Sequence, residues 1–130
     1  MGLDEKRKLK ELQDVTFPAR QKELNEICGT PIPYDVDWAS IADDLEGMKF
    51  IDNLSCHRIN MAFRVMCADQ LGKDSVKAVL KTIKLKNVKD KKDMKISFSN
   101  GVLEMHLAYA LRTEGMFNEF EIQKIVSDGL

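Results

Sequence analysis

The sequence predicts an α+β fold in which a three-stranded antiparallel β-meander, from about residue 82 to residue 109, is packed on one face by helices and followed by a C-terminal helix. Apolar residues recur at helical spacing before residue 80, and they alternate with polar residues after residue 82. The chain has 130 residues, of which 44% are hydrophobic and 32% are charged. This length and composition favour a single globular domain over residues 1–130.

The dipeptide Asn100-Gly101 is the clearest local signal, because it is the preferred pair in a two-residue type I′ hairpin turn. A turn at this position places three pairs of apolar residues on one face: Phe98 with Leu103, Ile96 with Met105, and Met94 with Leu107. The other face pairs Ser97 with Glu104 and Lys95 with His106. A shift of one residue would turn the whole apolar set to solvent, so the pattern specifies this register. The first strand of the meander is expected around Ile83 and Leu85.

The first part of the chain is predicted to be helical over residues 4–28, with an interruption near Thr16 and a left-handed stop at Gly29. Residues 30–34 contain two prolines and are predicted to form a loop. Asp37 is expected to cap a short helix that ends at Gly47, and Asn118 with Glu121 forms the capping box of the C-terminal helix.

The segment over residues 53–71 predicts a helix with two apolar faces rather than one. Ile59, Ala62, Phe63 and Met66 form the first face, and the second consists of Leu54, Met61, Val65 and Ala68. A surface helix needs only one apolar stripe. The helix is therefore expected either to lie between two layers of the fold, which we prefer, or to contribute a contact between copies in a homo-oligomer.

Several classes of protein are disfavoured by what the sequence contains. No apolar run approaches the roughly 20 residues that span a bilayer, and the first residues lack the apolar segment of a secretory signal. Three separated cysteines without a C-x-x-C spacing do not predict a disulfide framework or a zinc site. The segment 115–121 resembles part of a calcium loop, but the oxygen ligands that calcium needs are missing. We therefore expect a cytoplasmic protein with no membrane partner, no metal and no cofactor.

Catalytic chemistry has only weak candidates in this sequence. Cys56 and His57 are adjacent, and neighbouring residues of a helix point about 100° apart, so they do not face each other as a nucleophile and its base must. His106, on the predicted sheet, could still approach Cys56. A small enzyme that uses these three residues is an alternative hypothesis, and no catalytic residue is assigned.

The charges are segregated along the chain although the formal net charge is only −1. Six acids and one lysine lie between Asp35 and Asp52, whereas nine lysines and three acids lie between Lys73 and Lys95. The outer face of the predicted sheet carries Lys84, Lys86, Lys95 and His106. It is a candidate nucleic-acid surface, but it lacks the aromatic residues on which such sheet faces stack bases.

The acidic segment is the preferred candidate for a binding site. Aromatic side chains beside carboxylates are typical of protein interfaces, and an acidic surface would attract a basic partner. The predicted partner-binding residues are Tyr34, Asp35, Asp37, Trp38, Asp43, Asp44 and Glu46. The sequence thus favours a small binding protein that acts by protein–protein association. An immunity- or antitoxin-type inhibitor of a basic protein is one example, suggested by analogy of size and charge.

Overall fold

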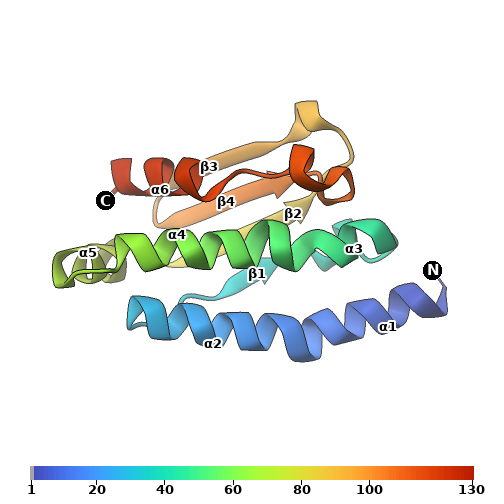
Figure 1. Ribbon diagram of the computed structural model, residues 1–130, viewed down its shortest axis with the longest axis horizontal. Coiled ribbons are helices and arrows are strands. Elements are labelled where there is room, and N and C mark those ends of the chain that lie inside the picture. The colour runs from blue at the N-terminus through green and yellow to red at the C-terminus, as the bar shows by residue number, and fades with distance from the viewer. Residues whose placement is uncertain (1) are drawn as a thin grey trace.

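A computed structural model describes residues 2–130 and places a layer of helices against one face of a β-sheet (Figure 1). Its α-helices are α1 (Leu3–Glu11), α2 (Phe17–Cys28), α3 (Leu45–Ile51), α4 (Arg58–Met66), α5 (Gln70–Val79) and α6 (Glu119–Asp128). Its strands are β1 (Tyr34–Val36), β2 (Thr82–Asn87), β3 (Lys95–Ser99) and β4 (Val102–Leu107). Helix α4 lies between α2 and α6, and it contacts both. The general α+β class and the helices on one face are as predicted.

The sheet differs from the predicted antiparallel meander. Within the described residues it is a mixed four-stranded sheet in the order β1-β2-β4-β3. Strand β2 pairs in parallel with β1 on one side and with β4 on the other, and only β3 and β4 are antiparallel. Residues 34–36 form the additional strand β1, whose first residue, Tyr34, was expected in a loop.

Burial explains why β4, and not β3, lies next to β2. The inward side chains of β4, which are Leu103, Met105 and Leu107, are all fully buried, as a central strand requires. The inward side chains of β3, Ile96 and Phe98, are only partly buried. The connection from residue 88 to residue 94 is long enough to carry the chain past the place of β4, and the tight turn then returns it into that place.

The predicted hairpin register is confirmed over the length of β3. Phe98 pairs with Leu103, Ile96 with Met105, Ser97 with Glu104, and Lys95 with His106. Asn100 and Gly101 both have positive φ, of 53° and 78°, as a type I′ turn requires. The ladder begins at Lys95, so the pair of Met94 with Leu107 lies outside it.

The two long helical segments are continuous where the sequence suggested breaks. Residues Leu12–Thr16 form a π-helical turn that joins α1 to α2, and Thr16 has helical dihedrals and no capping bond, so the predicted interruption is wrong. A second π-helical segment, Asp52–His57, joins α3 to α4. Gly29 ends α2 with a left-handed φ of 70°, as predicted.

The short helix and the two-faced helix have other limits than predicted. Asp37 caps a 3₁₀ turn over Trp38–Ser40, and Gly47 lies inside α3 rather than at a helix end. The helix expected over 53–71 ends at Met66. Its first face is buried except at Met66, which is partly buried, but Met61 and Val65 of the second face are 37% and 60% exposed. Ala68, beyond the end of α4, is exposed as well. The preferred expectation that both faces are covered is therefore wrong for most of the second face.

A network of polar side chains fastens α2 to α4 and to β1. Asn60, which is only 1% exposed, accepts a hydrogen bond from the hydroxyl of Tyr34 at 2.5 Å and donates to Glu23 Oε1 at 2.7 Å. Arg20 donates to both carboxylate oxygens of Asp52, at 2.8 and 3.0 Å. Because buried polar groups lose water on folding, each of these bonds is costly to leave unmade.

Replacing residues of this network should destabilise the fold in a defined order. Asn60→Ala leaves the Tyr34 hydroxyl and Glu23 without their partner and should lower the free energy of unfolding by about 2–3 kcal/mol. Tyr34→Phe removes one bond and should cost about 1 kcal/mol. Urea titrations measure both, with the exposed Gln70→Ala as a control that changes stability by less than about 0.5 kcal/mol. The reverse order would contradict the network.

Stability should also fall on acidification through Glu23. The hydrogen bond from Asn60, together with Arg20 and Arg64, lowers the pKa of Glu23 below its ordinary value. Its contribution is therefore full above the unfolded-state pKa of about 4.3 and is lost as the pH falls below that value. Unfolding free energies between about pH 5 and pH 3 should drop less steeply for Glu23→Gln than for the wild type. Glu26→Gln, an exposed neighbour on α2, should follow the wild-type curve.

Candidate functional site

The face of the sheet opposite the helices carries a row of charged side chains. Along β2 and β4 every second residue is buried against the helices, and the residues between them are exposed or partly exposed. We call this surface the outer face and define it by Asp35, Asp37, Lys84, Lys86, Lys95, Glu104 and His106. Pairing across the sheet places Asp35 beside Lys84, Lys84 beside Glu104, and Lys86 beside His106.

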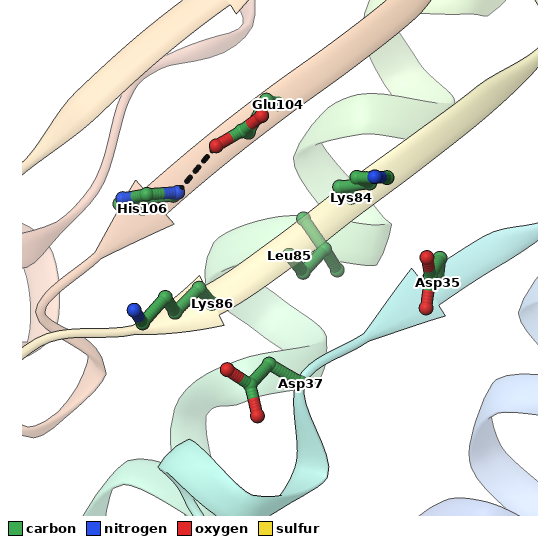
Figure 2. A pocket seen from close by; sticks show the side chains of 7 residues that line it. All are labelled: Asp35, Asp37, Lys84, Leu85, Lys86, Glu104 and His106. Atoms are coloured by element: carbon green, nitrogen blue, oxygen red, sulfur yellow. Dashed lines mark hydrogen bonds and ion pairs between the residues drawn. The ribbon is translucent and has the colours of Figure 1, made fainter.

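A shallow hollow of about 170 Å³ lies on the outer face. Figure 2 shows the residues that line it, which come from β1, β2, β4 and the segment after β1. They are Asp35, Asp37, Lys84, Leu85, Lys86, Glu104 and His106. Carboxylates, ammonium groups and the imidazole of His106 therefore surround one small depression, and no Phe, Tyr or Trp side chain lines it.

The charges on the outer face are only partly satisfied within the chain. Within residues 2–130, Glu104 forms both of the ion pairs on this face: its carboxylate lies 2.8 Å from His106 Nε2 and 3.6 Å from Lys95 Nζ. The hydrogen bond with His106, and then the charge of Lys95, lower the pKa of Glu104 below its ordinary value. Lys84 and Lys86 have no ion-pair partner among the described residues. These two ammonium groups are thus free to meet charges from outside the chain.

The aromatic residues predicted as interface anchors lie mainly within the fold. The rings of Tyr34 and Trp38 both pack edge-on against Phe17, with centroids 5.9 and 5.0 Å apart. The Tyr34 hydroxyl donates a hydrogen bond to Asn60, and burial raises the pKa of Tyr34 well above its ordinary value. Both rings therefore contribute to packing between α2 and the segment around β1.

The predicted acids are dispersed rather than gathered into one patch. Asp44 caps α3 and also accepts from Asn87 Nδ2 at 3.1 Å. Glu46 lies 3.1 Å from Lys49 and 3.9 Å from Arg112, and Asp43 is exposed. The remaining two predicted acids, Asp35 and Asp37, lie on the outer face.

The structure does bring together the four residues predicted as a nucleic-acid surface. Lys84, Lys86, Lys95 and His106 lie on one side of three neighbouring strands, as the alternation predicts. What sequence reasoning missed is that Asp35 and Asp37 share this side. The alternation of Tyr34, Asp35 and Val36 is a weak strand signal, and the prolines just before it concealed that signal.

The candidate catalytic residues do not meet. Cys56 is fully buried in the core beneath the sheet, and burial raises the pKa of its thiol far above the ordinary value. His106 projects from the outer face, on the other side of the sheet. His57 is partly buried at the end of the π-helical segment. The structure therefore does not gather these three residues into one site: the Cys56 thiol lies in the core, and the His106 ring lies on the opposite side of the sheet.

Two further kinds of site are absent from residues 2–130. No group of three or more His, Cys, Asp and Glu side chains in this range is arranged to hold a metal ion. None of the helices in the same range combines the length and the apolar character that a bilayer span requires.

The burial of the thiols gives a direct check on the core. Cys28 and Cys67 are also buried, with their sulfur atoms 3.9 Å apart, and burial raises the pKa of both. Native protein should therefore resist iodoacetamide at mildly alkaline pH, whereas protein in guanidinium should be alkylated at all three cysteines, as mass spectrometry would show. Rapid alkylation of Cys56 in the native state would contradict this placement and would favour the enzyme hypothesis.

Comparisons with known proteins add no assignment to this geometry. No family model, no curated protein and no solved structure matches the chain. What the protein does is therefore inferred from its own residues.

Proposed function

We propose that this protein acts by binding another protein through the outer face of its sheet. The observation that carries the proposal is a sheet face left open by the helices, on which acids and lysines surround one hollow. Lys84 and Lys86 have no ion-pair partner among residues 2–130, and Asp35 and Asp37 likewise form no ion pair within that range. A partner with the opposite arrangement of charges would neutralise them and set its own orientation on the sheet.

An inhibitor of the immunity or antitoxin type fits this proposal. Such a protein needs a stable scaffold and a charged surface, and it needs no catalytic group. Asp35 and Asp37 would face basic groups of the target, while Lys84 and Lys86 would face its acids. The partner proposed here thus has mixed charge at the contact, with its basic groups on the β1 side.

Nucleic acid is the second candidate, because three lysines and a histidine share the outer face. Two features weigh against it. Glu104 lies between these residues and would repel phosphate, and it already holds Lys95 and His106. The hollow also lacks a Phe, Tyr or Trp side chain on which a base could stack, and its one aromatic ring, that of His106, is held by Glu104.

The proposal is tested by neutralising the two lysines that have no intramolecular partner. In the double variant Lys84→Gln/Lys86→Gln, a protein captured from lysate by the immobilised wild type should be lost, and the affinity of that purified partner should fall at least about tenfold in calorimetry. The matched control is Lys22→Gln/Lys77→Gln, which removes the same charge from exposed positions on α2 and α5. The control should bind like the wild type.

Three outcomes would overturn the proposal. If the wild type captures no protein from lysate, the proposal that it binds one is wrong. Equal capture by the outer-face variant and the control would place the contact elsewhere. Retention of RNA in place of protein, with an affinity that falls steeply as salt is raised and that depends on Lys84 and Lys86, would establish the nucleic-acid alternative.

A further inference from the structure

The edge strand β3 has backbone groups that point away from the sheet. In β4, the carbonyl of Leu107 accepts from the N–H of Val88, just after β2, at 2.9 Å. Odd-numbered residues of β4 therefore bond toward β2, and its even-numbered residues bond toward β3. In the β3–β4 register, the even-numbered residues of β4 pair with the odd-numbered residues of β3, so these odd-numbered residues bond to β4. The N–H and C=O groups of Ile96 and Phe98 therefore face away from the sheet. Within residues 2–130, no hydrogen-bond partner reaches these groups.

At the opposite edge of the sheet, a side chain covers part of the backbone. At β1, the N–H of Tyr34 donates to Gln21 Oε1 at 2.6 Å, and the amide of Gln21 donates to the carbonyl of Ile32. A side chain of α2 thus satisfies the backbone at the start of that edge. Exposed strand edges are sites where another chain can pair, and natural proteins usually cover them. Among residues 2–130, no side chain covers the backbone of β3 in this way, and β3 is the longer of the two edge strands.

A hollow of about 380 Å³ lies directly beside this open edge. It is lined by Ile96 of β3 and by Glu121, Lys124, Ile125 and Asp128 of α6. Ile96 and Ile125 are both partly buried and form its apolar floor. An edge strand with free backbone groups, flanked by a helix and an apolar hollow, has the parts that strand-addition sites use: a ladder for affinity and a pocket for alternate side chains.

The charges of the hollow indicate what kind of segment fits. Asp128 is paired with Lys124 at 3.4 Å. Glu121 accepts the N–H of Asn118 but has no ion-pair partner among residues 2–130, so it is the unpaired carboxylate on this side of α6. A Cβ atom at Gly129 would collide with Phe98, which shows that the C-terminal end of α6 lies at Phe98. Glu121 consequently lies toward the Lys95 end of β3. A basic side chain at that end would be attracted to it.

A second copy of this chain fits the same edge less well. Two copies paired through β3 about a two-fold axis would place their α6 helices side by side and antiparallel. Glu121 of one copy would then approach Asp128 of the other, and like charges would oppose the contact. The groove-facing residues of β3 itself, Ile96 and Phe98, also include no basic group.

We propose that the edge of β3 and the flank of α6 bind an extended segment of a partner protein, which adds to the sheet as a strand antiparallel to β3. An apolar residue of the segment exchanges two hydrogen bonds with Ile96 and fills the hollow against Ile125. Two positions later, a Lys or Arg faces Glu121. Two positions earlier, a second apolar residue pairs with Phe98. This site is a different surface from the outer face and does not depend on the function proposed for it.

The test uses the full chain and the blocked peptide Ser-Thr-Val-Thr-Ile-Thr-Lys-Thr-Ser. Hydrogen exchange should show the amides of Ile96 and Phe98 exchanging freely in the unbound protein and becoming protected by the peptide, whereas the amide of Ser97 is protected in both states. The same peptide with N-methylated isoleucine keeps the side chain but lacks the N–H, and should bind at least about tenfold more weakly.

A charge exchange tests the specificity without relying on loss alone. Glu121→Lys should weaken the lysine peptide about tenfold and should restore binding to a peptide with glutamate in its place. That variant loses part of the α6 capping box, so its recovered binding also shows that it is folded. Glu114→Lys, which makes the same charge change at an exposed position outside the hollow, and Lys84→Gln/Lys86→Gln should both bind the lysine peptide like the wild type.

Each contrary result overturns the proposal. Absence of binding at millimolar peptide would do so, as would binding that the N-methyl group does not weaken. Failure of the glutamate peptide to rescue Glu121→Lys would remove the assigned charge recognition. Sedimentation as a dimer, with the amides of Ile96 and Phe98 already protected in free protein, would show that a second copy occupies the edge instead.

Discussion

The parallel pairing of β2 with β4 is the constraint on which the rest of the molecule depends. It places β4 between β2 and β3, which are consecutive in the chain, so that β3 becomes an edge and β4 a central strand whose inward side chains are fully buried. Lys84 and Lys86 then lie beside Glu104 and His106. An antiparallel meander would instead have put β3 in the middle, with Lys95 and Ser97 next to β2. The open edge of β3 and the neighbours of Lys84 and Lys86 on the outer face therefore follow from the same non-local pairing.

The parts of the structure that could be predicted from sequence are those governed by neighbours in the chain. The register of Phe98 with Leu103 follows from Asn100-Gly101, and the start of α6 follows from Asn118 and Glu121, because turn and capping chemistry act over a few residues. The place of β2 does not follow in the same way. Alternation shows which side chains of a strand are buried, but it does not show which strand lies next to it.

The candidate site was predicted in part for the same reason. Period-two alternation placed Lys84, Lys86, Lys95 and His106 on one face, which needs only local geometry. Adding Asp35 to that face required the pairing of β1 with β2, two strands that three α-helices (α3, α4 and α5) separate in the chain. Proximity in sequence was misleading for the acids. Asp44 caps α3 and accepts a hydrogen bond from Asn87, and Glu46 pairs with Lys49, so neither lies on the outer face.

Charge segregation in a sequence is thus weak evidence for a charged surface in the fold. The acidic segment contributes β1 and the basic segment contributes the neighbouring strand β2, so the outer face combines both signs although the chain separates them. Charges that meet across strands partly neutralise each other, and Glu104 shows this directly by holding Lys95 and His106. A surface of this kind has little long-range attraction for a polyanion. A partner of such a surface would be selected by the positions of the charges, and this favours a partner of fixed shape, such as the folded protein that we propose.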